Sequence, residues 1–380
     1  MKAMILAAGK GTRVRPLTHL VPKPMIPVLG RPVMEYLIDL LREHGVEQVM
    51  VNTSYKAPQI EDYFRDGSRF GVEIAYSFEG ELADDGALVD APVGSAGGLA
   101  RIQEHSGFFD STFVVLCGDA IVDLDLGAAL DDHRRSGALA TIVCKPVERE
   151  DVSSYGIVVA DESGRVSSFQ EKPRPEEARS DLANTGIYIF EPAVFEHIPR
   201  GESFDIGSQL FPALVEAGAA LHAVEARFRW IDIGNAPDYW TAVQHLLTDG
   251  RDLVRLPGRE VRPGVWAGLN VRADWDRITC SGPVVVGGSS RIEPGATIVG
   301  PAVIGPGCVV EAGARVERSV LFDHTRVSGH AAVVDMVVAG RWCVSRDGAV
   351  VDLAASDLSW AVDDARRRST EGRPSPLLEA

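Results

Sequence analysis

The residues best suited to chemistry stand in a glycine-rich turn near the N-terminus. The apolar run Lys2–Ala7 leads into Ala8-Gly9-Lys10-Gly11-Thr12-Arg13, and Lys23 follows between two prolines. Glycines let successive backbone N–H groups approach a phosphate chain, because they lack a side chain and tolerate positive φ. Arg13 and Lys23 would neutralise the bound phosphates. The turn lacks the third glycine of a dinucleotide fingerprint and the Gly-Lys-[Ser/Thr] of a Walker loop. Taken alone, it also fits a structural strand-to-helix turn.

Two aspartates follow apolar segments further along the chain. Phe113–Leu116 has the pattern of a central strand buried on both faces, and it runs directly into Cys117-Gly118-Asp119. Asp232 follows Trp230-Ile231 in the same way. Open α/β sheets bind ligands at the carboxyl ends of their strands. Because Mg²⁺ prefers hard oxygen ligands, a carboxylate at such a strand end is a candidate ligand of Mg²⁺. For either aspartate alone, capping of a helix or turn is the alternative.

The elements that must position these residues alternate between strands and helices up to about Leu247. Lys2–Ala7 and Val46–Asn52 are predicted strands. Val33–His44 is a predicted amphipathic helix with Gly45 as its C-cap. This alternation predicts an α/β fold with a Rossmann-like, mixed and mainly parallel sheet.

A different period begins after about Arg251. Aliphatic residues recur every six positions with Gly and Pro between them, at Val286, Ile292, Ile298, Ile304, Val310 and Val316, and the phase then slips by one residue. This repeat predicts a parallel β-helix with irregular later corners. We therefore divide the chain into a catalytic domain (1–248), a linker (249–281), a β-helix (282–352) and a C-terminal helix or tail (353–380). The polar end from about Ser369 is predicted to be disordered.

Taken together, these segments resemble the nucleotidyltransferases that make nucleotide sugars. The resemblance rests on Leu6–Arg13, Pro16-Leu17-Thr18 and Pro22-Lys23-Pro24, followed in the family's order by Gly94–Gly98, Cys117-Gly118-Asp119, Ser154–Val158, Phe169–Pro173, Asn184–Tyr188 and Trp230–Gly234. The six-residue repeat is similar to the left-handed β-helix that many members have behind the catalytic domain. The resemblance implies a GT-A-like nucleotidyltransferase fold followed by a left-handed parallel β-helix.

The resemblance also implies a role for each matching residue. The residues expected to bind the nucleotide are Leu6, Ala8, Gly9, Gly11, Thr12, Arg13, Gly94, Ser95 and Gly118. Those expected to bind the sugar phosphate are Gly156, Glu171, Lys172, Asn184 and Thr185. Arg13, Lys23 and Lys172 are the expected catalytic residues, and Asp119 and Asp232 the expected metal ligands. The sugar-phosphate oxygen would attack the α-phosphorus in line while pyrophosphate leaves, so that positioning and charge stabilisation dominate catalysis.

The substrates implied by the resemblance are a nucleoside triphosphate and a sugar 1-phosphate. The overall likeness to mannose-1-phosphate guanylyltransferases with a C-terminal β-helix favours GTP and mannose 1-phosphate. Glucose-1-phosphate thymidylyl-, adenylyl- or uridylyltransferase stays open, because the long segment Gly80–Val93 borders the expected base pocket. A cyclitol-phosphate nucleotidyltransferase also stays open, because recognition of the acceptor hydroxyls depends on geometry that the sequence does not show. Two alternatives belong to other classes: a non-catalytic regulatory subunit that binds an NDP-sugar, and a bifunctional enzyme whose β-helix is an acyltransferase.

Length and composition limit the domain number, the classes of partner and the location that we expect for this protein. A chain of 380 residues exceeds one hydrophobic core, so two domains are expected. The formal net charge of −16 argues against nucleic-acid binding. Ala3–Ala8 is too short for a signal-peptide core and no later run has membrane-spanning length, so we predict a cytoplasmic protein without membrane contact. The five scattered cysteines indicate neither disulfides nor zinc. Because β-helices often pair subunits, we expect a homo-oligomer, either a dimer or a tetramer.

Overall fold

The computed structural model describes residues 1–83 and 88–367. The chain forms two compact units. The first comprises Met1–Thr12, Val21–Ile26 and Pro32–Asp232, and the second comprises Arg13–Leu20, Pro27–Arg31 and the chain from Ile233 onward. Two short N-terminal segments therefore fold with the C-terminal part. Every helix in the described ranges falls short of the length and hydrophobicity that a membrane span requires.

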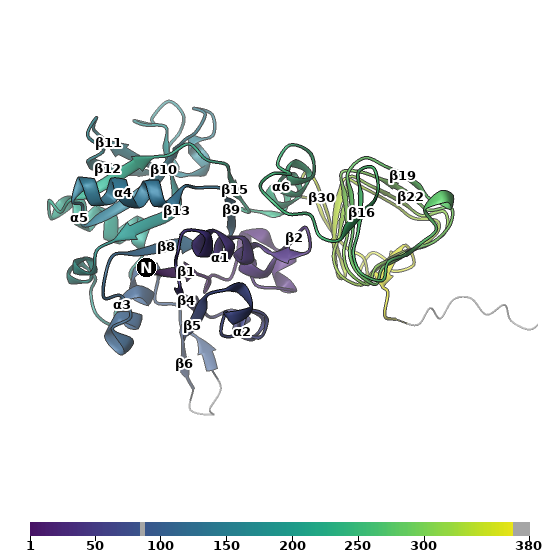
Figure 1. Cartoon of the computed structure of the whole chain (residues 1–380), viewed down its shortest axis with the longest axis horizontal. Helices are drawn as coiled ribbons and strands as arrows, with labels where there is room; N and C mark the ends of the chain where they lie inside the picture. The colour runs from purple at the N-terminus through teal and green to yellow at the C-terminus, as the bar shows by residue number, and fades with distance from the viewer. Residues whose placement is uncertain (84–87, 368–380) are drawn as a thin grey trace, which may run out of the picture. The chain divides into compact units, whose positions relative to one another are not determined.

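The first unit is built on a nine-stranded mixed sheet (Figure 1). Its parallel half runs from β8 (Phe113–Cys117) through β1 (Lys2–Leu6) and β4 (Gln48–Thr53) to β5 (Glu73–Phe78). Strand β13 joins β8 in antiparallel pairing and leads to the rest of the sheet. The remaining strands are β10 (Ala140–Pro146), β11 (Gly156–Ala160), β12 (Val166–Glu171), β13 (Leu182–Phe190) and β14 (Leu221–Glu225).

Alternating residues of the central strands supply a separate core on each face of the sheet. Ala3 and Ile5 pack with α1 (Val33–Glu43), α2 (Ala57–Phe64) and α4 (Leu126–Ser136), whereas Met4 packs with α3 (Ser95–Ser106) and α5 (Phe211–Glu216). Both faces of β1 and β8 are thus covered, as the apolar runs predict. Because β1, β4 and β8 are parallel, the residues that follow them meet at one edge of the sheet.

Smaller elements complete the first unit. A two-stranded ribbon of β9 (Ala120–Val122) and β15 (Trp230–Asp232) lies beyond the carboxyl end of β8. A hairpin of β6 (Gly80–Leu82) and β7 (Leu88–Asp90) extends beyond β5. Helix α6 (Ala236–Thr248), which we expected in the catalytic domain, belongs to the second unit.

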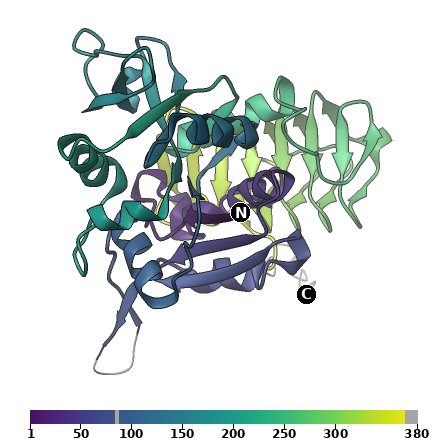
Figure 2. The same cartoon turned by 60° about the vertical axis from the view of Figure 1, so that its left-hand side comes forward.

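The second unit is a stack of coils, each of which gives one strand to each of three sheets (Figure 2). The first coil contains β17 (Val265–Ala267), β18 (Arg272–Ala273) and β19 (Thr279–Ser281). Each pairs in parallel with a strand of the next coil. Val284 pairs with Ala302, 18 residues later, and so each of these coils contains three six-residue repeats. Val303 pairs with Val320, 17 residues later, which explains the one-residue slip. The predicted parallel β-helix is therefore present, and its left-handed sense stays a prediction.

The later strands complete the three sheets. They are β20 (Val284–Val286), β21 (Arg291–Ile292), β22 (Thr297–Val299), β23 (Ala302–Ile304), β24 (Val309–Val310), β25 (Arg315–Glu317), β26 (Val320–Leu321), β27 (Thr325–Val327) and β28 (Ala332–Val334). The antiparallel strands β29 (Met336–Ala339), β30 (Trp342–Ser345) and β31 (Val350–Asp352) follow them. Aliphatic side chains of all three sheets share one core.

The segment boundaries differ from those expected. Residues 249–281 are not a simple linker: β16 (Arg259–Arg262) pairs with β17, and β17–β19 are the first coil. This coil lacks the strict repeat, so its sequence does not reveal it. Within 353–367 the structure has turns and β32 (Val362–Asp364), which pairs antiparallel with β27, instead of a helix. The disorder predicted from about Ser369 lies outside the described residues.

Candidate active site

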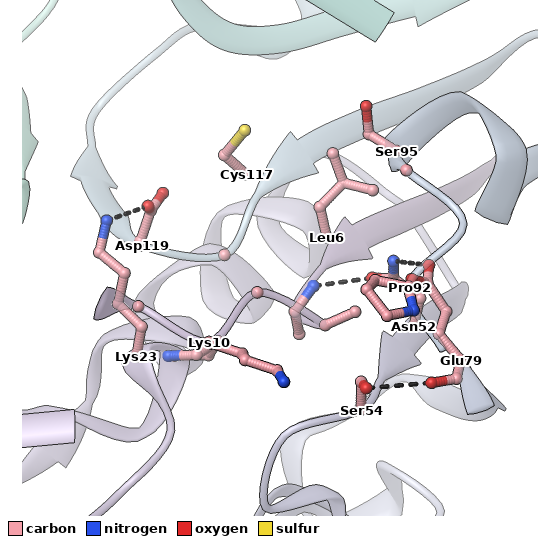
Figure 3. Close-up of a pocket in the computed structure, with 17 residues that line it drawn as sticks. Leu6, Lys10, Lys23, Asn52, Ser54, Glu79, Pro92, Ser95, Cys117 and Asp119 are labelled. Atoms are coloured by element: carbon pink, nitrogen blue, oxygen red, sulfur yellow. Dashed lines mark hydrogen bonds and ion pairs between the residues drawn. The ribbon is translucent and has the colours of Figure 1, made fainter. Parts of the chain in front are cut away.

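A cavity of about 350 Å³ lies at the carboxyl edge of the parallel strands (Figure 3). Many residues predicted to bind the nucleotide or catalyse the reaction line it, together with several that were not predicted. The predicted residues in its wall are Leu6, Ala8, Gly9, Gly11, Lys23, Gly94, Ser95, Gly118 and Asp119. Segments that lie far apart in the sequence therefore meet where the strand-end rule places a ligand.

The glycine-rich turn lines this cavity and leaves space beside Gly9. A Cβ atom added at Gly9 would meet nothing within 4 Å. Gly11 has φ +58°, in the left-handed region that glycine adopts at no steric cost. Thr12 follows at the start of a 3₁₀ turn and is exposed. Arg13 begins a segment of the second unit, and its contact with the β and γ phosphates stays a prediction.

Gly118 sits in a close approach between the ends of β8 and β1. Its N–H donates to the Leu6 carbonyl oxygen at 3.0 Å, and an added Cβ would lie 2.8 Å from that same oxygen. Only glycine fits this contact without displacing the strands. The next residue, Asp119, faces the cavity, where its carboxylate accepts a hydrogen bond from Lys23 Nζ.

The two predicted metal ligands occupy neighbouring positions. Asp232 of β15 is paired with Ala120 of β9, the residue after Asp119. Opposed Cα atoms in an antiparallel ribbon are roughly 4.5–5.5 Å apart. Burial raises the pKa of Cys117 strongly, and the nearby charges of Asp119 and Asp232 raise it further.

This donor set fits a magnesium ion that is shared with a substrate. Within residues 1–83 and 88–367, no group of three or more His, Cys, Asp or Glu side chains is arranged to hold a metal. Binding of Mg²⁺ by Asp119 and Asp232 stays a prediction, in which the two carboxylates supply two oxygen ligands and substrate and water supply the others. Mg²⁺ is commonly bound in this way, by one or two carboxylates together with phosphate oxygens.

Three of the residues predicted to bind the sugar phosphate meet in a second cluster. Gly156 is paired with Glu171 across β11 and β12. A Cβ atom at Gly156 would lie 3.3 Å from Glu171 Oε2 and 4.0 Å from the Cβ of Asn184. Lys172 follows with φ +47°, and its N–H donates to the Tyr155 carbonyl. The Tyr155 ring contacts Trp230, with 4.9 Å between ring centroids.

Thr185 differs from its expected role. It is 4% exposed, and its hydroxyl donates to the Val143 carbonyl oxygen at 2.7 Å. The side chain therefore stabilises the pairing of β10 with β13 next to an irregularity in their register. Its position beside Asn184 in the sequence could not show this, because neighbouring residues of a strand point to opposite faces.

The segment around Gly94 is shaped by packing as well as by the cavity. Gly94 has φ +76°, and an added Cβ would lie 2.5 Å from the Phe204 carbonyl oxygen. The Ser95 hydroxyl donates to Asp205 and accepts from the Ile206 N–H, both at 2.8 Å. These bonds fix the start of α3 at the wall of the cavity.

Sequence reasoning missed a buried polar group in the same wall, formed by Asn52, Ser54 and Glu79. The Asn52 side chain accepts from the Ala7 N–H at 2.7 Å and donates to Glu79 at 2.6 Å. Burial raises the pKa of Glu79, against the lowering effect of the hydrogen bonds that it accepts from Asn52 and from the Val93 N–H. One signal was available: Asn52 lies near the carboxyl end of β4, beside β1, where the strand-end rule applies as it does to Asp119.

Family models match most of the chain. One described as nucleotidyl transferase matches residues 2–249, and one described as the GMPPB C-terminal domain matches residues 280–354. The chain belongs to the nucleotidyl transferase family. This confirms the family resemblance, and the observed sheet and coils agree with the predicted fold class.

Similar proteins of this nucleotidyl transferase family differ in their named substrates. A UTP–glucose-1-phosphate uridylyltransferase of Synechocystis sp. is 56% identical over 373 residues, which cover 98% of this chain and 96% of the relative. A mannose-1-phosphate guanylyltransferase of Mycobacterium tuberculosis is 31% identical over 332 residues, which cover 87% and 82%. The crystal structure of HddC from Yersinia pseudotuberculosis complexed with GMP-PN is 26% identical, with a TM-score of 0.53, and covers 64% of this chain and 99% of that chain.

The chain is therefore a sugar-1-phosphate nucleotidyltransferase, whose family substrates are a nucleoside triphosphate and a sugar 1-phosphate. The expected preference for GTP and mannose 1-phosphate is not confirmed, because the two relatives differ in both the base and the sugar.

Proposed function

We propose that this enzyme transfers a uridylyl group from UTP to glucose 1-phosphate, giving UDP-glucose and pyrophosphate. The supporting observation is the 56% identity, over nearly the full length of both chains, with a protein named UTP–glucose-1-phosphate uridylyltransferase. Guanylyl transfer to mannose 1-phosphate is the second candidate, supported by the 31% identical relative that matches 87% of this chain.

The reaction joins a phosphate oxygen of glucose 1-phosphate to the α-phosphorus of UTP and breaks the bond to the β-phosphate. Backbone N–H groups of the Gly9–Gly11 turn and the ammonium of Lys23 bind the triphosphate. Glu171, Lys172 and Asn184 bind and orient the sugar phosphate. Alignment and charge stabilisation supply most of the rate enhancement in such transfers.

Magnesium has a defined part in this proposal. Asp119 and Asp232 would hold Mg²⁺, which when bound neutralises charge on the phosphate oxygens. Lys23 donates to Asp119 in the present structure. Its ammonium is therefore positioned beside the carboxylate that we assign to the metal, in the wall of the cavity that we assign to the triphosphate.

The experiment is a substrate panel scored by pyrophosphate release. UTP, dTTP, GTP and ATP are each combined with glucose 1-phosphate or mannose 1-phosphate, with MgCl₂ or with EDTA. We expect the highest kcat/KM for UTP with glucose 1-phosphate, by at least about tenfold, because base-edge hydrogen bonds discriminate strongly. A higher kcat/KM for GTP with mannose 1-phosphate would establish the second candidate instead. No release from any pair would favour a non-catalytic binding subunit.

Variants of the two predicted metal ligands test whether pyrophosphate release depends on Asp119 and Asp232. Asp119→Asn and Asp232→Asn are each expected to lower kcat by at least about a hundredfold, since a carboxylate ligand is lost where phosphate charge must be neutralised. Asp131→Asn is the matched control, because Asp131 is an exposed residue of α4 that pairs only with Arg134 in the described contacts. Equal activity of all three variants would remove the metal assignment.

The predicted homo-oligomer, a dimer or tetramer, is part of the same proposal. Sedimentation equilibrium of the full chain measures it, and a monomer at micromolar concentration would contradict it.

A further inference from the structure

We propose that Asn52 and Glu79 are positioning residues: through a buried chain of hydrogen bonds they fix the spacing between the glycine-rich turn and the Val93–Ser95 turn of the nucleotide cavity. This inference rests on the proposed binding of a nucleoside triphosphate in that cavity. Both side chains lie in the wall of that cavity, and the role inferred here is their effect on the two turns.

The chain begins where the ladder between β1 and β4 ends. Leu6 is paired with Asn52, and the next N–H, that of Ala7, donates to Asn52 Oδ1 at 2.7 Å. This donor fixes the orientation of the amide, because the atom it meets must be the oxygen. The amide nitrogen then donates to Glu79 Oε1 at 2.6 Å. Ala7 directly precedes Ala8 and Gly9, so the chain starts at the base of the glycine-rich turn.

The carboxylate of Glu79 completes the connection to the other turn. The Val93 backbone N–H also donates to it. Val93 directly precedes Gly94 and Ser95, which line the cavity. Asn52 and Glu79 are each 3% exposed, so water does not compete for these bonds. Removing one partner from such a buried set leaves an unsatisfied polar group and costs more than the bond itself contributes.

The surrounding backbone leaves the carboxylate almost no freedom. A Cβ atom added at Gly98 would lie 2.5 Å from Glu79 Oε1, so the first turn of α3 packs directly against it. The Glu79 carbonyl oxygen accepts from the Ser54 hydroxyl at 3.0 Å, and its N–H donates to the Thr53 carbonyl at 2.7 Å. Glu79 has two donors on its carboxylate, and its backbone is bound to β4. These contacts hold it in one position between the glycine-rich turn and the Val93–Ser95 turn.

An exchange of the two polar groups tests the role of the hydrogen bonds themselves. Glu79→Gln alone sets its new NH₂ group against another donor, either Asn52 Nδ2 or the Val93 N–H. Asn52→Asp alone sets a second carboxylate against that of Glu79. In the double variant, the new carboxylate at position 52 accepts from the Ala7 N–H and from the new amide at position 79. The oxygen of that amide accepts from the Val93 N–H, so all three bonds return without a change in total charge.

Each single variant should weaken binding of the nucleoside triphosphate, and the double variant should restore it. Each single variant should raise KM for the nucleoside triphosphate about tenfold, as expected for one unsatisfied buried group, with a much smaller change in KM for the sugar 1-phosphate. The double variant should return to within about threefold of the parent KM, because the pairing is restored. Thr141→Val is the matched control. It removes the buried contact between Thr141 and His133, outside the cavity, and should lower the melting temperature without changing KM for the triphosphate.

Two results would overturn the inference. The first is a double variant no better than the worse single variant. The second is single variants that lower the melting temperature but leave KM for the triphosphate unchanged. If the single variants do not fold, Gly98→Ala gives the same information, because its methyl group displaces the Glu79 carboxylate while every partner is kept. An unchanged KM in that variant would also overturn the inference.

Failure of the proposed function is a separate outcome. If the parent enzyme turns over no triphosphate, the proposed function is refuted. The same variants are then compared by the affinity for each triphosphate in calorimetry, where the order of loss and rescue must be the same for the inference to stand.

Discussion

Gly118→Ala is the substitution whose effect follows most directly from the structure. The added methyl carbon would lie 2.8 Å from the Leu6 carbonyl oxygen, which is 0.6 Å short of the 3.4 Å at which ordinary contact begins. This oxygen belongs to the backbone and cannot rotate away as a side chain could. It also accepts the hydrogen bond from the Gly118 N–H, so the methyl group fits only if the ends of β1 and β8 separate. Forcing a methyl group into a packed site of this kind costs about 1–3 kcal/mol.

The consequence for catalysis comes from what those two ends position. Leu6 leads into the glycine-rich turn, and Asp119 follows Gly118, so a shift of about half an ångström changes the distance between the predicted triphosphate site and a predicted metal ligand. Misplacement of about 1 Å can cost a hundredfold in rate. We therefore expect kcat/KM to fall between about tenfold and a hundredfold.

The assay is steady-state pyrophosphate release, with thermal unfolding measured on the same samples. Gly127→Ala is the matched control, because Gly127 is a residue of α4 whose added Cβ would meet only the Asp125 carboxylate, at 3.2 Å. It should keep the parent kcat/KM, and any change in melting temperature would come from the start of α4 and not from the site. Parent values of kcat/KM and melting temperature in Gly118→Ala would refute the reasoning, since the strands would then have absorbed the methyl group without moving the site.

Three further predictions concern other parts of the first unit. Gly9→Ala should keep the melting temperature, because its Cβ meets nothing within 4 Å, but should raise KM for the triphosphate about tenfold in the pyrophosphate assay by filling the space that we assign to phosphate. Thr185→Val should lower the free energy of unfolding in urea by about 1–2 kcal/mol, because the Val143 carbonyl loses its buried donor; an unchanged value would contradict the burial of that bond. Burial lowers the pKa of His133, so the unfolded chain takes up a proton below about pH 6.5 that the native state resists, and stability should fall as pH falls through that range. The contribution at pH 5.5 is at most about 1.4 kcal/mol, and His133→Gln should show a flatter dependence in urea titrations at pH 7.5 and 5.5.

The sequence predicted the parts of the site that depend on chain direction and residue type. Glycines after β1 and an aspartate after β8 lie at the same sheet edge because parallel strands share their carboxyl ends. The pairing of Asp232 beside Asp119 depends on the ribbon of β9 and β15, whose two strands are more than a hundred residues apart. Composition and periodicity contain no information about that pairing, and only the family resemblance suggested it.

The strand-end position of Asn52 is a signal in the sequence, but the buried chain of hydrogen bonds between Asn52 and Glu79 could not be predicted, for a different reason. Asn52 and Glu79 are ordinary polar residues at strand ends, and each alone fits a solvent-exposed turn. Their role follows from burial and from the donors that they meet, which are properties of tertiary contacts. The same holds for Thr185, because a hydroxyl that is paired inside the sheet cannot be told from a substrate-binding hydroxyl before its partner is known.

The second unit shows why the domain boundary could not be placed by periodicity alone. Its members include Arg13–Leu20 and Pro27–Arg31, which no repeat marks as part of a β-helix. The Tyr239 hydroxyl of α6 donates to the Pro27 carbonyl oxygen at 2.7 Å, and Leu20 packs 3.3 Å from the position of a Cβ added at Gly340, between β29 and β30. The second unit therefore takes part of its packing from the segment that joins the glycine-rich turn to α1. A chain cut at about residue 248 would keep Tyr239, the partner of Pro27, but would lose Gly340 and its contact with Leu20, so such a cut would remove part of the packing of the segment between the glycine-rich turn and α1.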